Sequence, residues 1–255
     1  MLTSFPQCWG HRGASLDYPE NTISSFESAA RSGSEGIETD VHITSDDYIL
    51  MFHDHNLGRT TRTGTGSIKS QPYADNIEHF RTTKLPEQKI PTFDETLEWL
   101  SRAENSHMII HLDIKPSNDP VHLFTLMRKA LERYPAWEES IAPRMVLGLW
   151  HPKFVDPALS ILPSLRRCFI GVHLGLAQAP VFWDTCDAFS IAFPLLTIGE
   201  GPAFRARCKS AGKKVYAWTM NRPEEWALGI EWGLDVIMTD TPNAYIAFRK
   251  RMQGE

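Results

Sequence analysis

The chain has 255 residues, of which 42% are hydrophobic and 22% are charged, a globular composition with enough length to bury one large core. Twenty-six Lys and Arg residues against 31 Asp and Glu residues give a formal charge of −5, which argues against the broad basic surface that nucleic-acid binding requires. No apolar run approaches the roughly 18 residues of a membrane-spanning helix, and the N-terminus lacks the basic and apolar segments of a secretory signal.

Short apolar or aromatic stretches alternate along the chain with longer stretches of helical spacing, which is the pattern of alternating strands and helices. The expected strands are 7–10, 36–43, 108–115, 145–150, 168–172, 188–193, 214–220 and 236–239, with an extra extended stretch at 48–54. The expected helices include 22–32, 93–103, 120–134, 202–211 and 223–232, several of which begin with residues that favour helix starts.

Eight consecutive strand and helix units in a chain of 255 residues favour an α/β fold, a (β/α)8 TIM barrel. An open doubly wound sheet is the second choice. No linker or repeat divides the chain, so residues 1–255 are expected to form one domain. A polar segment rich in Gly and Thr, at about 55–91, is expected to be a small insertion after the second unit.

The four cysteines indicate a reducing environment. They share no CxxC spacing, so neither a zinc site held by thiolates nor a framework of disulfides is expected. The prediction is a cytoplasmic protein, with a peripheral position at a membrane or lipid surface as the alternative. The cysteines are Cys8, Cys168, Cys186 and Cys208.

In a parallel barrel the active site lies at the carboxyl ends of the strands, so polar residues at those positions are the candidates for a site. Several of the predicted strands end in such residues. The candidates are His11, Arg12, Glu38, Asp40, His53, Asp113, Lys115 and Trp218.

The three acids suit a divalent cation. Glu38 and Asp40 are two residues apart on one strand, so their side chains point to the same side, and carboxylates inside a barrel need a counter-charge. With Asp113 they supply three oxygen ligands, which favour a hard cation such as Mg²⁺ or Ca²⁺. A solvated surface pair or a local salt bridge is the alternative for Glu38 and Asp40.

The basic candidates have two expected tasks. Arg12 offers a planar fork that matches phosphate and Lys115 a compact charge, so both suit an anionic substrate. His11 and His53 are the pair able to take and give a proton near neutral pH. A hydrogen-bonded structural role is the alternative for each histidine.

Two further side chains remain open. Trp218 is either barrel packing or a wall for substrate. His42 shares the strand face of Asp40 and is a further candidate, whereas the other histidines are interpreted mostly as surface or core residues. Those are His55, His79, His107, His111, His122, His151 and His173.

Motifs around the candidate residues follow a fixed order. They are His11-Arg12-Gly13, Pro19-Glu20-Asn21-Thr22, Glu38-Thr39-Asp40-Val41 with Thr44 and Asp46, His53-Asp54 with Leu57 and Arg59-Thr60-Thr61, Asp113-Ile114-Lys115, Trp218-Thr219-Met220-Asn221 and Ile237-Met238-Thr239-Asp240-Thr241-Pro242. This series resembles the glycerophosphodiester phosphodiesterase family. The resemblance is dense from residue 10 to residue 61 and weak from residue 116 to residue 213.

The resemblance implies a metal-dependent phosphodiester hydrolase on a (β/α)8 barrel. A glycerol hydroxyl would attack the neighbouring phosphorus, and water would open the resulting cyclic phosphate, so that an alcohol and glycerol phosphate are released. The family commonly has Glu where this chain has Asp113, so the expected distance to the metal changes. The implied ligands of one Mg²⁺ or Ca²⁺ ion are Glu38, Asp40 and Asp113, the implied phosphate-binding residues are Arg12 and Lys115, and the implied general base and acid, in either order, are His11 and His53.

Within the family, Leu112-Asp113-Ile114-Lys115, Gly148-Leu149-Trp150 and segment 214–219 also resemble fungal phosphatidylglycerol-specific phospholipases C. Segments 174–183 and 193–198, expected as loops after the fifth and sixth strands, are strongly apolar, as a lipid substrate would require. The alternative is that Phe182, Trp183, Leu195 and Leu196 only cover helices. A C-terminal helix with Arg249, Lys250 and Arg251 is weak support for membrane contact.

The expected substrate is therefore a glycerophosphodiester or a glycerophospholipid. The alternatives are a phospholipase C that releases diacylglycerol, a sphingomyelinase D-like enzyme that stops at the cyclic phosphate, and an inactive barrel that binds phosphodiesters or lipid head groups.

Overall fold

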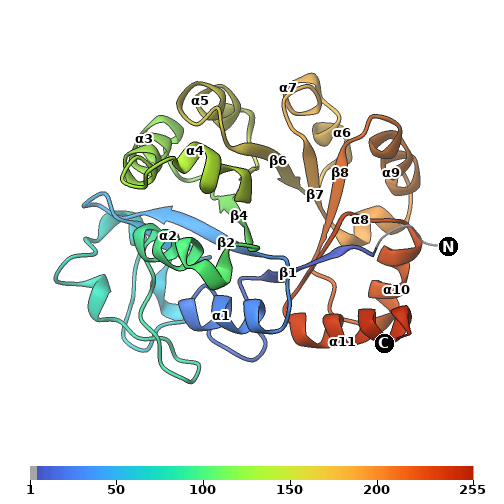
Figure 1. Ribbon diagram of the computed structural model, residues 1–255. Helices are drawn as coiled ribbons and strands as arrows, with labels where there is room; N and C mark the ends of the chain where they lie inside the picture. Colours follow the sequence, from blue (N-terminus) through green and yellow to red (C-terminus); the bar gives the residue numbers. More distant parts are fainter. Residues whose placement is uncertain (1–4, 255) are drawn as a thin grey trace.

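The computed structural model describes residues 5–254, and in that range eight parallel strands form a closed barrel (Figure 1). The strands follow the order β1, β9, β8, β7, β6, β5, β4 and β2, and β1 also pairs with β2. The prediction of a (β/α)8 barrel is confirmed, and the open doubly wound sheet is wrong because the first strand, β1, pairs with both β2 and the last strand, β9. The parallel strands are β1 (Gln7–His11), β2 (Gly36–Ile43), β4 (Ile109–Ile114), β5 (Met145–Leu149), β6 (Arg166–Gly171), β7 (Ala188–Ala192), β8 (Lys214–Trp218) and β9 (Val236–Thr239).

The ends of these strands lie within two residues of the predicted ends. The larger difference is in the extended stretch expected at 48–54, of which only β3 (Ile49–Met51) is a strand, antiparallel to β2. The backbone N–H of Phe52 makes one more hydrogen bond to the β2 strand, to the carbonyl oxygen of Asp40 at 2.9 Å. The chain leaves the sheet after Phe52, and His53 reaches the mouth of the barrel.

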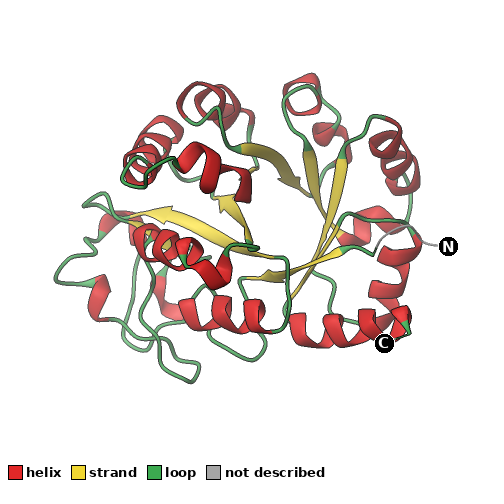
Figure 2. Ribbon diagram, in the orientation of Figure 1, coloured by secondary structure: helices red, strands yellow, loops and turns green. Residues whose placement is uncertain are grey.

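Helices form a ring outside the strands (Figure 2). The five helices expected from the sequence are present, with ends shifted by up to three residues. Within residues 5–254 no helix combines the length and the hydrophobicity needed to cross a membrane. The helices are α1 (Ile23–Arg31), α2 (Phe93–Ser101), α3 (Pro120–Leu131), α4 (Trp137–Ser140), α5 (Val155–Ile161), α6 (Leu174–Ala177), α7 (Pro180–Trp183), α8 (Phe193–Thr197), α9 (Gly201–Ser210), α10 (Pro223–Glu231) and α11 (Pro242–Gln253).

The apolar segments 174–183 and 193–198 are not the loops that the sequence predicts, because they contain α6, α7 and α8. Helices of four or five residues leave no readable period in a sequence. Pro180 is the first residue of α7 and Pro194 the second residue of α8, positions at which a backbone N–H has no partner within the helix. Phe182 and Leu196 are fully buried, so these helices pack on the barrel.

The first turn after β1 depends on a glycine. Gly13 has φ of +78°, and a Cβ there would lie 2.4 Å from the hydroxyl oxygen of Ser25 in α1. Thr22 caps α1 by accepting a hydrogen bond from the backbone N–H of Ser25. This turn therefore brings the start of α1 directly against the carboxyl end of β1.

The hydrophobic core has three parts. The largest lies between the strands and the surrounding helices. A second fills the barrel interior around Trp9 and Tyr216, whose ring centroids are 4.8 Å apart, so the barrel is a packed core with a cup at one end. The third lies under the insertion and includes Leu57, Ile77 and Ile90.

The segment at 55–91 lies beside the barrel, and its helices are the single-turn 3-10 helices η1 (Leu57–Arg59), η2 (Ile68–Ser70) and η3 (Ile77–His79). Isolated bridges join Asn56 to Ser67 and Thr61 to Thr82. The structure also has 3-10 helices outside this segment, which are η4 (Ala103–Asn105), η5 (Ala142–Arg144) and η6 (Pro152–Phe154). That residues 1–255 act as one domain stays a prediction.

The four cysteines are free and buried, and burial raises the pKa of Cys8 and of Cys208 to about 12. Because thiolate is the reactive form, we expect the native protein at pH 8 to react with Ellman's reagent at least about a hundredfold more slowly than the protein unfolded in guanidinium chloride. Absorbance at 412 nm after mixing measures the rate. Rapid labelling of any cysteine in the native protein would contradict the packing described here.

Candidate active site

The carboxyl ends of the parallel strands surround a cavity of about 110 Å³. All eight side chains singled out in the sequence line this cavity, so the structure brings every one of them together. Their roles stay predictions at this point. The other lining residues are His111, Trp150, Ile170, Ser190 and Met238.

Three carboxylates share the charged wall of the cavity with one ammonium group. Lys115 Nζ lies 2.5 Å from Asp40 Oδ1 and 2.7 Å from Asp113 Oδ2. Burial would raise the pKa of Asp40, but Lys115 and Arg12 hold it well below its ordinary value. Burial and the charge of Asp40 raise the pKa of Glu38 to about 8. Glu38 is therefore the carboxyl group whose charge is least compensated.

The donor set fits a hard divalent cation. Glu38, Asp40 and Asp113 each offer one oxygen, and these oxygens lie within 4.8 Å of one another. They are carboxylate oxygens, the ligands that Mg²⁺ and Ca²⁺ prefer. A divalent cation would also supply the positive charge that Glu38 lacks.

Neutral donors orient two of these carboxylates. The backbone N–H of Arg12 donates to Glu38 Oε2 at 3.0 Å, and Asn21 Nδ2 donates to Asp40 Oδ2 at 2.7 Å. The amide oxygen of Asn21 accepts from the hydroxyl of Thr39 at 2.7 Å. Asn21 has φ of +57°, a left-handed conformation that Asn adopts more readily than most residues.

His11 is fixed by a carboxylate from the last strand–loop junction. Its Nδ1–H donates to Asp240 Oδ1 at 2.7 Å, and its Nε2 lies 3.9 Å from Glu38 Oε2. Asp240 also accepts hydrogen bonds from Ser15 and Asn221 at 2.9 and 2.6 Å. Burial would lower the pKa of His11, but the bond to Asp240 and the charge of Glu38 raise it above its ordinary value.

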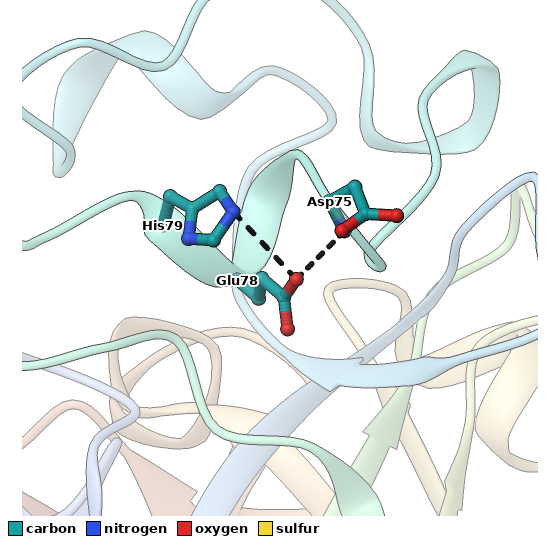
Figure 3. Close-up of side chains that lie close together, drawn as sticks. All are labelled: Asp75, Glu78 and His79. Carbon is teal, nitrogen blue, oxygen red and sulfur yellow. Dashed lines mark hydrogen bonds and ion pairs between the residues drawn. The ribbon is translucent and has the colours of Figure 1, made fainter.

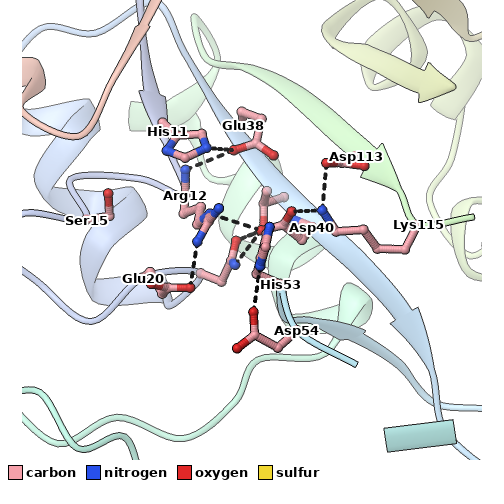
Figure 4. Close-up of polar contacts among 12 residues, drawn as sticks. His11, Arg12, Ser15, Glu20, Glu38, Asp40, His53, Asp54, Asp113 and Lys115 are labelled. Atoms are coloured by element: carbon pink, nitrogen blue, oxygen red, sulfur yellow. Dashed lines mark hydrogen bonds and ion pairs between the residues drawn. The ribbon is translucent and has the colours of Figure 1, made fainter. Parts of the chain in front are cut away.

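His53 is held in the same way by its neighbour (Figure 4). Its Nδ1–H donates to Asp54 Oδ1 at 2.7 Å, and Arg59 Nε donates to Asp54 Oδ2 at 2.5 Å. Arg59 also bonds to Glu20, which accepts from Arg12 at 3.0 Å. In both histidines a carboxylate binds Nδ1, so Nε2 is the nitrogen left for a substrate.

Two tryptophans form an aromatic part of the cavity wall. The rings of Trp150 and Trp218 meet edge to face, with centroids 5.9 Å apart. Trp150 Nε1 donates to Asp113 Oδ1 at 2.6 Å, whereas Trp218 Nε1 has no hydrogen-bond partner among residues 5–254. His111 is fully buried, and burial lowers its pKa to about 3, so its imidazole is neutral.

A model of the Glycerophosphoryl diester phosphodiesterase family matches residues 11–244. The chain belongs to this family. Glycerophosphodiester phosphodiesterase 1 of Homo sapiens is 35% identical over 249 residues, which cover 84% of this chain and 72% of that protein. This member of the family is an enzyme, a phosphoric diester hydrolase.

Solved structures of other proteins have the same fold. A phosphodiesterase from Oleispira antarctica, solved with the product sn-glycerol-3-phosphate, has a TM-score of 0.79 at 22% identity and covers 96% of this chain and 97% of that chain. A glycerophosphodiester phosphodiesterase from Parabacteroides distasonis has a TM-score of 0.78 at 20% identity and covers 97% of this chain and 98% of that chain.

Sequence reasoning missed several site residues of this family member. Trp150 and Asp240 stand inside motifs of the family resemblance, but nothing in the sequence assigns them a partner. His111 is interpreted as surface or core from the sequence, although it lines the cavity. Strand parity would have found it, because His111 is two residues before Asp113. His42 is buried and bonds through Nε2 to the carbonyl oxygen of His53, outside the cavity lining.

A second group of acidic and imidazole side chains lies on the insertion (Figure 3). Asp75, Glu78 and His79 are neighbours in sequence, and the backbone N–H of Asp75 donates to Glu78 Oε1 at 2.7 Å. His79 Nε2 lies 3.7 Å from the same oxygen. Asp75 and His79 are exposed, and these contacts are those of a local turn.

Replacing Asn21 is expected to destabilise the protein. Asn21→Ala removes the acceptor of the Thr39 hydroxyl and the amide donor of the buried Asp40 Oδ2, which we expect to lower the free energy of unfolding by about 2–4 kcal/mol. Urea denaturation followed by circular dichroism measures it. Asn56→Ala is the control, because Asn56 is exposed and makes no side-chain cap. Equal stability of the two variants would show that Asn21 does not support Asp40.

Proposed function

We propose that this enzyme hydrolyses glycerophosphodiesters and releases an alcohol and glycerol phosphate. The observation that carries the proposal is the pair of histidines, each bonded through Nδ1 to a carboxylate, beside three carboxylates that fit a divalent cation. The Oleispira antarctica phosphodiesterase of the same fold binds the product sn-glycerol-3-phosphate, which supports the same product here.

The charged wall would bind the phosphate. Glu38, Asp40 and Asp113 would hold one Mg²⁺ or Ca²⁺ ion, which when bound supplies charge that stabilises the negative charge added at phosphorus. Arg12 and Lys115 supply positive charge from the chain itself. Trp218 would form the wall beside the glycerol, with its free N–H as a donor for a substrate oxygen.

We assign His11 as the first base and His53 as the first acid. The side chain of His11 is 16% exposed and that of His53 is 35% exposed, and His53 also lines an outer groove with Asn56 and Pro116. His11 takes the proton of the glycerol hydroxyl as its oxygen bonds to phosphorus. His53 gives a proton to the leaving alcohol as the old P–O bond breaks. Water then opens the cyclic phosphate, with the two histidines exchanging roles.

A phospholipase C that acts on phosphatidylglycerol is the second candidate. Phe182 and Leu196 are buried, and Trp183 and Leu195 pack against the core, so these four side chains cover the barrel as the alternative interpretation predicts. The same segments still expose Leu176 and Ile198, by 36% and 76%, and Val172, just before the first segment, is 60% exposed. These three exposed apolar side chains support contact with a lipid surface. Membrane contact and the cytoplasmic location both stay predictions.

Product formation from soluble and lipid substrates separates the candidates. We expect glycerol phosphate from glycerophosphocholine and glycerophosphoglycerol with Mg²⁺ or Ca²⁺, and a loss of at least about a hundredfold in rate with EDTA. Chromatography of the products measures this.

Each other outcome supports a different candidate. Turnover on phosphatidylglycerol vesicles alone would replace the proposal with the phospholipase C. A persistent cyclic phosphate would indicate a sphingomyelinase D-like reaction, and tight substrate binding without any product would indicate an inactive barrel.

The histidine roles have a separate test. His11→Ala and His53→Ala should each lower kcat by roughly 10²- to 10⁴-fold, because proton transfer is lost, while calorimetry still detects metal binding. His79→Ala is the matched control, since His79 is exposed on the insertion. A kcat equal to that of the wild type in both His11→Ala and His53→Ala would contradict the proposed acid and base roles.

A further inference from the structure

Each of the three carboxylates in the cavity accepts one hydrogen bond from a neutral N–H group. Glu38 accepts from the backbone of Arg12, and Asp40 accepts from the amide of Asn21. Asp113 accepts from the indole of Trp150, whose Nε1 lies 2.6 Å from Asp113 Oδ1. The third donor thus comes from a different strand and from a residue 37 positions away in the chain.

We propose that Trp150 is a positioning residue that fixes the carboxylate of Asp113 for a divalent cation. This inference rests on the metal site of the proposed function. Asp113 Oδ2 is bonded to Lys115 Nζ at 2.7 Å, so the indole bond to the other oxygen fixes the plane of the carboxylate. A donor that orients a metal ligand typically changes metal affinity 10- to 100-fold when it is removed.

The surroundings of Trp150 hold its indole in place. Its ring meets Trp218 edge to face, at an interplanar angle of 66°. Strand β5 has Gly148 two residues earlier, where a Cβ would lie 2.3 Å from Ile170 Cδ1. The space next to Asp113 is therefore closed from the side of Ile170, and the indole of Trp150 provides the N–H that reaches Asp113.

The ring and the N–H of Trp150 have separate surroundings. The ring also lines the outer groove, of about 550 Å³, which His55, Asn56 and Pro116 share. Among residues 5–254 the N–H bonds to the Asp113 carboxylate alone. Trp150→Phe therefore removes the donor and keeps a ring in the wall, whereas Trp150→Ala removes both.

Isothermal titration of Mg²⁺ and of Ca²⁺ into the metal-free protein tests the proposal. Trp150→Phe should raise the metal Kd by roughly 10- to 100-fold. Trp232→Phe should leave it within about twofold, because the ring of Trp232 stacks on Phe193 outside the cavity. A metal Kd for Trp150→Phe within twofold of the wild type would overturn the inference.

Kinetics separate positioning from a structural role. At saturating metal, Trp150→Phe should recover kcat to within about threefold of the wild type, and Trp150→Ala should also raise KM. If Trp150→Phe does not fold by circular dichroism, Trp150→His and Trp150→Leu replace it. The His variant keeps an N–H and should bind the cation at least about fivefold more tightly than the Leu variant. Equal affinities of these two would overturn the inference.

Failure of the proposed function is distinguishable from failure of this inference. A wild-type protein that binds the cation and hydrolyses no diester would contradict the function, and the calorimetric comparison would still decide the role of Trp150. A wild-type protein that binds neither cation would overturn both the metal site and the role of Trp150.

Discussion

The ion pairs of Lys115 with Asp40 and Asp113 are the interaction on which the site depends. Buried carboxylates without a counter-charge cost several kcal/mol each, and Lys115 lies within 2.7 Å of both. With Glu38 and Arg12 included, the group would carry three negative and two positive charges if every carboxyl group were ionised. Burial and the charge of Asp40 raise the pKa of Glu38 to about 8, so without a metal ion Glu38 keeps its proton near neutral pH. A divalent cation would favour the ionised form of Glu38 and supply the charge that the three carboxylates need.

The two histidines depend on different parts of the molecule. His11 ends the first strand, and its partner Asp240 follows the last strand, so the bond between them crosses the seam where the barrel closes. Asn221, which follows β8, holds Asp240 from the next strand. His53 is held by adjacent Asp54, which in turn accepts a hydrogen bond from Arg59 in η1. Changes that loosen barrel closure should therefore affect His11 more than His53.

Strand parity is what made most of the site predictable. The backbone fixes a period of two in a strand, so Glu38 with Asp40, and Asp113 with Lys115, had to share a face once the strands were located. The barrel itself followed from the alternation of strands and helices. Helices α6, α7 and α8 were not predictable, because one helical turn buried by apolar side chains leaves no period in the sequence.

Partners in hydrogen bonds were not predictable for a different reason. The Trp150 bond to Asp113 joins residues 37 positions apart, and the His11 bond to Asp240 joins residues 229 apart. Such pairs depend on the register of neighbouring strands and on the loops after them. The sequence alone does not give the strand register, so it shows the two residues of each pair in separate motifs and does not indicate that they are in contact.

The two walls of the cavity come from different parts of the chain. Every charged or imidazole side chain in the lining lies at or before Lys115, whereas Trp150, Ile170, Ser190, Trp218 and Met238 all come later. The family resemblance is dense in the first part and weak between residues 116 and 213. Phosphate chemistry needs the charged wall whatever alcohol leaves, so the proposed acid, base and phosphate-binding groups all come from the first part of the chain. Trp150 contributes to both walls, because its ring lies in the aromatic and apolar wall and its N–H bonds to the Asp113 carboxylate in the charged wall.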